Sequence, residues 1–305
     1  MSLALEVATG AVRGGTSILF AALGETVAER AGVINLGTEG SMLCGALAAF
    51  AIGAETGSTW VGVGAAAVAG GALAALHAYL VLRRGANQLA NGLVILFLGL
   101  GLTSLFGGDY VQADVALLQP WAVPGLSSIP WLGDIFFDQD PLTYLSYLAV
   151  PVCWWVLFRS RWGLLVRGAG ERVEVLDTYG HPASLVQFAA VVVGGMLAGL
   201  GGAQLSVAYT GAWFENMTQG RGFIAVAVVI FASRQPFRVA AGAYLFGAAL
   251  ALSPALQARG VAINQFALDA IPYAVTLVVL VAFGRRQAAE APEGLRKVFE
   301  ISAGP

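Results

Sequence analysis

A chain of 305 residues in which 58% are hydrophobic and only 11% are charged excludes both a soluble globular domain and a disordered chain. The apolar runs repeatedly reach about 20 residues, the length that a helix needs to cross a bilayer, and the alternating pattern of a membrane β-barrel does not occur. The net charge of −2 says little about partners. We therefore predict an all-α, polytopic membrane protein.

The first third of the chain predicts four spans and one broken helix. The first span ends near residue 28, and the next three cover residues 40–54, 58–82 and 86–106. Three glycines and five polar side chains interrupt the apolar sequence within residues 25–40, which predicts a helix break between the first two spans. These polar residues are Glu25, Glu29, Arg30, Asn35 and Glu39.

The rest of the chain predicts five further spans and a second break. Residues 109–140 form the longest non-helical segment, with five aspartates and no basic residue. Spans follow at residues 142–158 and 185–209. The sequence TGAWFENMTQGRG then breaks the pattern, and the apolar run at residues 223–232 is too short to cross a bilayer alone. The last two spans cover residues 239–256 and 266–283.

Small residues and amides mark two faces of the predicted spans. Gly195, Gly199 and Gly202 form a small-residue seam in the sixth span, which suits close helix packing. Asn87 and Asn91, at the start of the fourth span, are four residues apart and are expected on one helical face.

The strongest concentration of charge lies between the fifth and sixth spans, at residues 159–181. Glycines punctuate this stretch, and Val173, Leu176 and Tyr179 recur every three residues, which predicts a short amphipathic helix between two turns. Such a helix between membrane spans would be a protruding docking element, or knob, for a partner protein in the aqueous phase. An ordinary charged loop is the alternative.

The distribution of basic residues predicts the orientation of the chain. Twelve of the sixteen Lys and Arg side chains lie in the connections after the third, fifth and seventh spans and after the ninth. By the positive-inside rule these connections are cytoplasmic, which places the N-terminus and residues 109–140 outside and the tail, residues 287–305, inside. Cys44 and Cys153 lie within apolar runs and indicate neither a disulfide nor a metal site.

A shift of 180 residues aligns the chain with itself. It places the GG at residue 14 on the GG at residue 194, and the TEG at residue 38 on the TQG at residue 218. Because the first span would run inward and the sixth outward, the two halves form an inverted repeat of the kind found in many transporters.

The repeat places two polar pairs near the membrane midplane, one from each broken segment. Unpaired charges at this depth cost about 2.5–3.5 kcal/mol each, so Glu39 and Arg221 should face a cavity, a partner or one another. We expect polar side chains here to line a substrate pathway. A buried hydrogen-bonded pair that only holds the broken helices is the alternative. The predicted pathway residues are Asn35, Glu39, Asn87, Asn91, Gln219 and Arg221.

Five segments, in this order, resemble the permease subunits of ABC importers for nucleosides: ERAGVINLGTEGSM, ANQLANGL, RGAGERVEVLDTYG, MTQGRGFIAVAVVIF and IPYAVTLVVL. These permeases belong to the superfamily of ribose-type and branched-chain amino acid permeases, in the branch that depends on basic-membrane-protein-type lipoproteins. The resemblance covers about residues 10–286. GERVE stands where such permeases often read GENPE, so the start of the coupling helix should be shaped differently here.

The resemblance implies a type II-like importer permease with about nine transmembrane helices. It would form one domain at residues 1–286, with inverted halves at about residues 10–108 and 184–284. A cytoplasmic coupling helix at about residues 167–182 would dock to an ATP-binding subunit. The residues expected to carry this coupling are Arg167, Gly168, Glu171, Val173, Leu176, Asp177, Tyr179 and Gly180.

The resemblance also implies three partners: a second, paralogous permease subunit, a cytoplasmic ABC ATPase that holds ATP and magnesium, and an extracellular substrate-binding lipoprotein. The chain has no Walker A motif and its only lysine is Lys297, so ATP hydrolysis is expected on another chain. We expect no cofactor, metal or nucleic acid on this chain. The expected location is the plasma membrane, in contact with lipid.

Two other classes of function stay open from the residues alone. An ion-coupled secondary carrier would share the inverted repeat and broken helices but needs coupling carboxylates, for which Glu39 is the one strong midplane candidate. A membrane enzyme needs a catalytic or metal-binding constellation, whereas His77 and His181 are isolated in the sequence. Within the permease family, simple sugars, purine bases or riboflavin are alternatives to a nucleoside.

Overall fold

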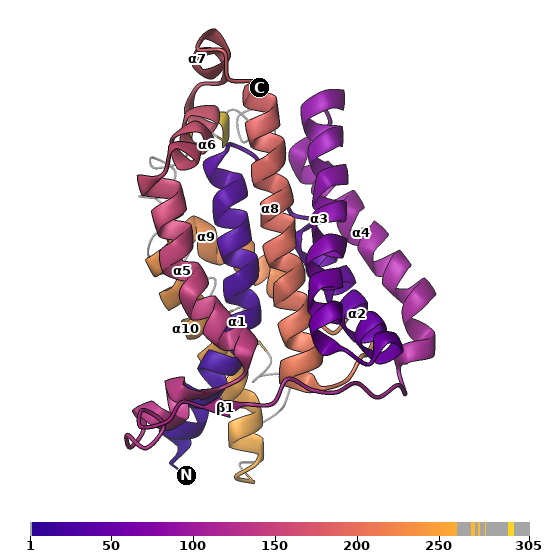
Figure 1. Cartoon of the computed structure of the whole chain (residues 1–305), viewed down its shortest axis with the longest axis vertical. Helices are drawn as coiled ribbons and strands as arrows, with labels where there is room; N and C mark the ends of the chain where they lie inside the picture. Colours follow the sequence, from indigo (N-terminus) through magenta and orange to yellow (C-terminus); the bar gives the residue numbers. More distant parts are fainter. Residues whose placement is uncertain (1, 261–269, 272–273, 275–277, 279–291, 296–305) are drawn as a thin grey trace.

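The computed structural model describes residues 2–260, 270, 271, 274, 278 and 292–295, and this part of the chain is almost entirely helical (Figure 1). Six of its helices are long and apolar enough to cross a membrane, which confirms an all-α, multi-pass membrane protein. They are α1 (Leu3–Arg30), α3 (Thr59–Arg84), α4 (Gln88–Gly107), α5 (Pro141–Arg159), α8 (Ala183–Ala203) and α10 (Pro236–Gln257). The other α-helices are α2 (Thr38–Thr56), α6 (Arg161–Glu171), α7 (Val173–Thr178) and α9 (Arg221–Phe231).

Local sequence explains where several helices begin and end. The side chains of Ser2, Asn87, Asp140 and Ser160 accept hydrogen bonds from backbone N–H groups in the first turns of α1, α4, α5 and α6. These groups have no partner within their own helix, so each cap stabilises a helix start. α3 ends at Gly85, whose φ of +68° is a conformation that glycine adopts without strain.

The connection from α4 to α5 contains only short elements. A 3₁₀ turn, η1 (Gly108–Tyr110), is followed by an antiparallel pair of two-residue strands, β1 (Trp121–Ala122) and β2 (Asp138–Gln139), with a π-turn, η2 (Gly133–Phe137), before β2. Arg13 on α1 donates hydrogen bonds to the Gln139 side chain and to the Asp138 carbonyl, both at 3.1 Å. The connection is therefore fixed to the first half of α1.

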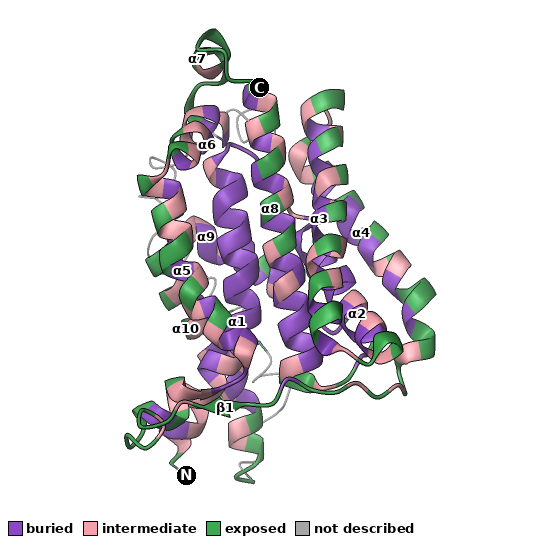
Figure 2. Cartoon of the chain, viewed as in Figure 1, coloured by how far each residue is buried: buried purple, intermediate pink, exposed green. Residues whose placement is uncertain are grey.

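α1 is the centre of the helix bundle. Every residue from 14 to 29 is buried, and Figure 2 shows α1 buried over most of its length. Ile18 and Leu19 pack with Val228 on α9 and Phe246 on α10, while Phe20 packs with the buried side chains of α2. A helix that is apolar on all sides belongs in such a position, because its neighbours cover every face.

The predicted glycine seam packs helices against one another at backbone distance. A Cβ on Gly195 would collide with α3 at Ala74, one on Gly199 with the carbonyl of Ala66, and one on Gly202 with a carbonyl of α2. Small residues allow this approach, which stabilises helix pairs where lipid supplies no hydrophobic drive. The sequence prediction of a close-packing seam on α8 is confirmed.

The helix order recurs after a shift of 180 residues. The shift moves α1 to residues 183–210, which is the extent of α8 together with the π-turn η3 (Gln204–Thr210), and it moves α3 onto residues that overlap α10. In Figure 1 α1 rises from the N-terminus and α8 descends from α7, so the two run in opposite directions. The packing corresponds as well, since Gly15 on α1 lies against Ala243 on α10 and Gly195 on α8 lies against Gly70 on α3. We infer an inverted repeat.

Two expectations from the sequence need correction. First, α2, at the second predicted span, is not among the six helices long and apolar enough to span, whereas the shortness of α9 agrees with the prediction that its apolar run cannot cross alone. With 11 residues, α9 is about 16 Å long and crosses only about half of the hydrocarbon. The ninth predicted span, residues 266–283, and most of the tail, residues 287–305, lie outside the described residues.

Second, the predicted coupling helix is two helices. α6 ends at Glu171, Arg172 has extended backbone (φ −148°, ψ 98°), and α7 begins at Val173. Gly168 and Gly170 occupy the last turn of α6, where glycine weakens a helix by about 1 kcal/mol relative to alanine. The break falls within GERVE, the segment for which the sequence predicts an altered shape.

Candidate functional site

Glu39 lies where the two broken helices meet, in the first turn of α2 and beside the start of α9. Its side chain is buried. The Thr218 hydroxyl and the backbone N–H of Gly220 donate hydrogen bonds to Oε1 at 2.6 and 2.7 Å, and the N–H of Gly222 donates to Oε2. A carboxylate here satisfies N–H groups that α9 leaves unpaired and lies at the positive end of its dipole. Glu39 therefore fixes the start of α9 on α2.

Arg221, the first residue of α9, is half-buried and contacts α1 and η3. Its guanidinium lies 5.5 Å from the ring centroid of Tyr209, and Nη1 donates a long hydrogen bond of 3.4 Å to Ser17 Oγ. Among the ion pairs of the described residues, none joins Arg221 to Glu39. Gln219, two residues earlier, is exposed and has a φ of +48°. The second broken segment thus keeps two polar side chains at least partly accessible.

Glu25 holds the first break in the way that Glu39 holds the second. Its Oε1 accepts a hydrogen bond of 2.8 Å from the backbone N–H of Asn35, and its Oε2 accepts one of 3.0 Å from the Thr38 hydroxyl. The Asn35 side chain is buried and accepts a hydrogen bond from the N–H of Gly37. Asn35 therefore shapes the turn that leads into α2.

The two asparagines at the start of α4 differ in burial and in contacts. Asn87 is the exposed N-cap of α4, where it accepts hydrogen bonds from the first helical turn. Asn91 is buried and lies 2.9 Å from His77 Nδ1, and His77 Nε2 lies 3.0 Å from the carbonyl oxygen of Ile34. Asn91 and His77 therefore support the backbone of the first break.

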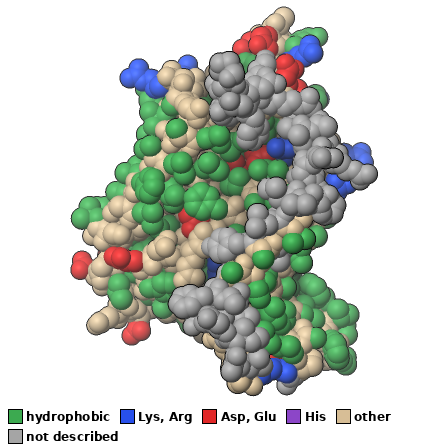
Figure 3. Space-filling view, turned by 180° about the vertical axis from the view of Figure 1, so that it is seen from behind, with side chains coloured by type: hydrophobic (Ala, Val, Ile, Leu, Met, Phe, Trp, Pro, Cys, Tyr) green, Lys and Arg blue, Asp and Glu red, His purple; other side chains and the backbone are tan. Residues whose placement is uncertain are grey.

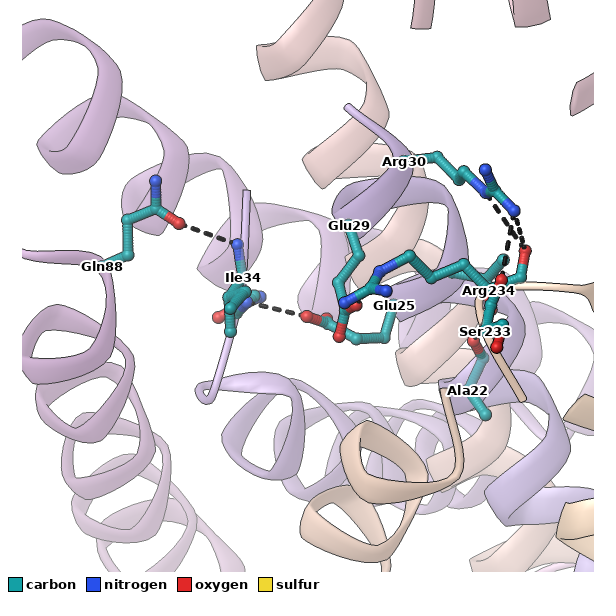
Figure 4. A network of polar contacts seen from close by, with 10 residues as sticks. Ala22, Glu25, Glu29, Arg30, Ile34, Gln88, Ser233 and Arg234 are labelled. Carbon is teal, nitrogen blue, oxygen red and sulfur yellow. Dashed lines mark hydrogen bonds and ion pairs between the residues drawn. The ribbon is translucent and has the colours of Figure 1, made fainter. Parts of the chain in front are cut away.

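A buried charge cluster joins the C-terminal end of α1 to the turn between α9 and α10 (Figure 4). Arg234 Nε lies 2.6 Å from Glu29 Oε2, and both side chains are at most 3% exposed. Arg30 donates hydrogen bonds from Nε and Nη2 to the carbonyls of Ser233 and Arg234 at 3.2 Å. Ser233 and Arg234 have positive φ angles of 52° and 57°, so the cluster holds a turn that non-glycine residues rarely adopt.

Sequence reasoning missed this cluster. Arg234 was counted among the basic residues that mark the cytoplasmic side, although its side chain is buried in an ion pair with Glu29. The available signal was the presence of two carboxylates on a span that is otherwise apolar, since buried carboxylates need a partner. The two residues are more than 200 positions apart, so spacing could not pair them.

The six predicted pathway residues therefore fall into two groups. Asn35, Glu39 and Asn91 are buried and hold the breaks of the helices, and Asn87 caps α4. Gln219 and Arg221 have exposed or half-exposed side chains and, among the described residues, hold neither a break nor a helix start through a capping bond. Within the part of the chain that the structure describes, no group of three His, Cys, Asp or Glu side chains could hold a metal ion.

The knob, residues 161–180, consists of α6 and α7 and lies at the end of the molecule where α5 ends and α8 begins (Figure 1). α7 has no buried residue, and Figure 2 shows it exposed. Val173, Val175 and Tyr179 are 37%, 45% and 79% exposed, and Gly180, with a φ of +78°, turns the chain back toward α8. Exposed apolar side chains that gather on a protruding helix are typical of a contact surface.

Other predicted coupling residues face the base of the knob. Leu176 packs on Gly168, where an added Cβ would lie 2.5 Å from the Leu176 side chain. Asp177 Oδ1 accepts a hydrogen bond of 3.0 Å from the backbone N–H of Ala183, at the start of α8. Leu176 and Asp177 thus position α7. Val175, which the spacing of three did not select, is one of the exposed residues.

α6 is held by α5 and by a short piece of the C-terminal tail. The guanidinium of Arg167 lies 5.4 Å from the ring centroid of Phe158. Glu171 Oε2 accepts a hydrogen bond of 3.4 Å from the N–H of Glu293, and Leu295 is fully buried. Arg167 and Glu171 therefore make contacts within the chain that set the angle of the knob.

Comparison with known proteins agrees with this architecture. Residues 8–283 match the family described as branched-chain amino acid transport system / permease component. The chain belongs to this family of membrane permeases, so it is a transport component and not itself an enzyme. The resemblance stated from the sequence motifs is confirmed.

Three relatives are similar over nearly their whole length. The chain is 40% identical to a putative glucose ABC transporter permease of Haloferax volcanii, with 92% of each chain covered. It is 30% identical to a nucleoside ABC transporter permease of Lactococcus lactis, with 93% of each covered. It is 31% identical to a guanosine ABC transporter permease of Bacillus subtilis, over 90% of this chain and 91% of the relative. No solved structure matches the chain.

Proposed function

We propose that the chain is the membrane-spanning permease subunit of an ATP-driven ABC importer for a nucleoside. The observation that supports this most strongly is the similarity over nine-tenths of the chain to two nucleoside-type permeases, together with an exposed apolar knob at one end of the helix bundle. The similarity supports the class of transporter, and the exposed knob supplies a surface for a subunit that hydrolyses ATP.

The exposure and contacts of these residues support the following division of labour. Val173, Val175 and Tyr179 on the knob contact the ATPase, while Leu176 and Asp177 transmit its movement to α6 and α8. The breaks before α2 and α9 form the moving part, because their helix starts depend on a few side-chain contacts. Arg221 and Gln219 face the solute, and a lipoprotein and a second, paralogous permease complete the importer.

The orientation proposed from the basic residues puts the N-terminus outside and the knob inside. Arg83, Arg84 and four arginines of residues 159–172 still support it after Arg234 is discounted. Cysteines placed at Gln119 and at Val175 should react with an impermeant thiol reagent from opposite sides of a sealed cell. Labelling of Val175→Cys from outside would invert the orientation.

Uptake by the assembled importer tests the solute. Proteoliposomes that hold this chain, its ATPase and its partner permease, supplied with the lipoprotein, should accumulate labelled guanosine, and an excess of unlabelled nucleoside should compete. Competition by an excess of glucose, with none by nucleosides, would contradict the nucleoside assignment.

Glucose is the second candidate, because the relative with 40% identity is a putative glucose permease. Both candidates carry a sugar ring with several hydroxyl groups. The binding preference of the purified lipoprotein partner separates them, since affinity for guanosine and not for glucose supports the first proposal and the opposite supports the second.

A further inference from the structure

A small cavity of about 200 Å³ lies between the end of α3 and the start of α8. Its walls are Tyr79, Leu82 and Arg83 from α3 and Ser184, Leu185 and Phe188 from α8. It is separate from the broken-helix junction, and it lies beside the base of the knob because α8 begins five positions after α7 ends.

The polar groups of this cavity have no partner within the described chain. Arg83, Tyr79 and Ser184 make no hydrogen bond or ion pair with another residue. Arg83 and Tyr79 are exposed, and Arg84 adds a second guanidinium at the same helix end. Asp177, the acidic residue closest to the start of α8, is bonded to the N–H of Ala183 and does not line the cavity.

The apolar groups lie on one side of these polar groups. Leu82, Leu185 and Phe188 form an apolar wall, and Leu185 is 55% exposed. A hydrophobic wall that leads to a cation and two hydroxyl groups at a membrane boundary matches an acyl chain attached to a phosphate. Arginine suits a phosphate because its planar fork donates two parallel hydrogen bonds.

We propose that this cavity binds one anionic phospholipid, with the lipid phosphate on Arg83, Tyr79 and Ser184 and an acyl chain along Leu185 and Phe188. The bound lipid fills the space between α3 and α8 and so supports the base of the knob. This site does not depend on which solute the importer carries.

The lipid retained by the purified importer complex tests this site. Complexes extracted from vesicles of equal phosphatidylglycerol and phosphatidylcholine are compared by native mass spectrometry. The wild type should keep phosphatidylglycerol, and Arg83→Gln should lower its retention about tenfold, as expected for the loss of charge-assisted hydrogen bonds. Arg161→Gln, which removes an exposed arginine of the knob, should leave retention unchanged.

A second variant and a second ligand test the apolar wall and the need for an acyl chain separately. Leu185→Gln keeps the cation but removes part of the apolar wall, so it should also lose the lipid. Inorganic phosphate at the same concentration should not displace the lipid, because it lacks the acyl chain. The proposal would be overturned if Arg83→Gln kept the lipid as the wild type does, or if free phosphate displaced the lipid. It would also be overturned if cross-linking showed another subunit in the cavity.

Discussion

Single side chains hold each irregular point of the backbone. Glu25 and Glu39 each place a carboxylate at a helix start, and Asn91 with His77 supports the carbonyl of Ile34. Buried polar groups in a membrane protein need such partners, because lipid offers none. Glu25, Glu39, Asn91 and His77 therefore stabilise the backbone at the two breaks, independently of any role in transport.

Replacing Glu39 by glutamine tests its structural role. A glutamine amide would direct an N–H toward the backbone N–H of Gly220 or Gly222, so Glu39→Gln should lower the free energy of unfolding by about 1–3 kcal/mol. Thermal unfolding of the purified permease measures this. Glu215→Gln makes the same change at an exposed position and should have no effect. Normal stability with lost uptake would instead place Glu39 in the pathway.

The ion pair of Glu29 and Arg234 allows a double-mutant cycle. Glu29→Gln or Arg234→Gln alone leaves a buried charge unpaired, which should cost about 3–5 kcal/mol. The double variant should cost much less than the sum of the two, since it removes both charges. Unfolding measured for all four proteins gives the coupling, and additive effects would mean that the two charges do not depend on each other.

At the scale of elements, the sequence predicts where a helix or a break exists better than it predicts what the residues there contact. The breaks near residues 31–37 and 211–220 were predictable, because polar residues and glycines interrupt apolar runs there. The contact of Glu39 with the start of α9 was not, since about 180 residues separate the partners. A spacing of three also cannot assign the faces of α7, which is only six residues long and has Leu176 turned inward and Val175 outward.

The knob gives a prediction at this scale. Val175→Asp should abolish co-purification of the ATPase while leaving the thermal stability of the permease unchanged, because Val175 is 45% exposed on a helix that has no buried residue. Leu176→Asp should lower both, because Leu176 packs on Gly168. Arg161→Gln is the control and should affect neither. Full ATPase binding by Val175→Asp would show that α7 is not the docking element.

The glycine seam between α8 and α2 gives a second prediction at the scale of elements. Gly202→Ala would push a Cβ into the carbonyl of Met42, so it should destabilise the permease by about 1–3 kcal/mol. Gly64→Ala on α3, where nothing lies within 4 Å, is the matched control and should be neutral or stabilising by up to about 1 kcal/mol, because alanine favours the helix. Equal unfolding temperatures for the two variants would contradict close packing at the seam.

At the scale of the whole molecule, other helices pack around a buried α1, and the elements expected to move are the breaks before α2 and α9. The charge cluster at the C-terminal end of α1 ties this helix to the turn between α9 and α10. The knob connects α5 to α8, and α8 packs against both α1 and α2. In the proposed importer, movement of the knob would reach the two breaks through α8.

The source of energy for transport tests this account most directly. In proteoliposomes that contain the assembled importer, uptake of labelled solute should require ATP on the side of the knob and should continue after ionophores collapse all ion gradients. It should stop when the ATPase subunit carries an inactive ATP site. Uptake that persists without ATP and follows an imposed proton or sodium gradient would contradict the account and favour an ion-coupled carrier.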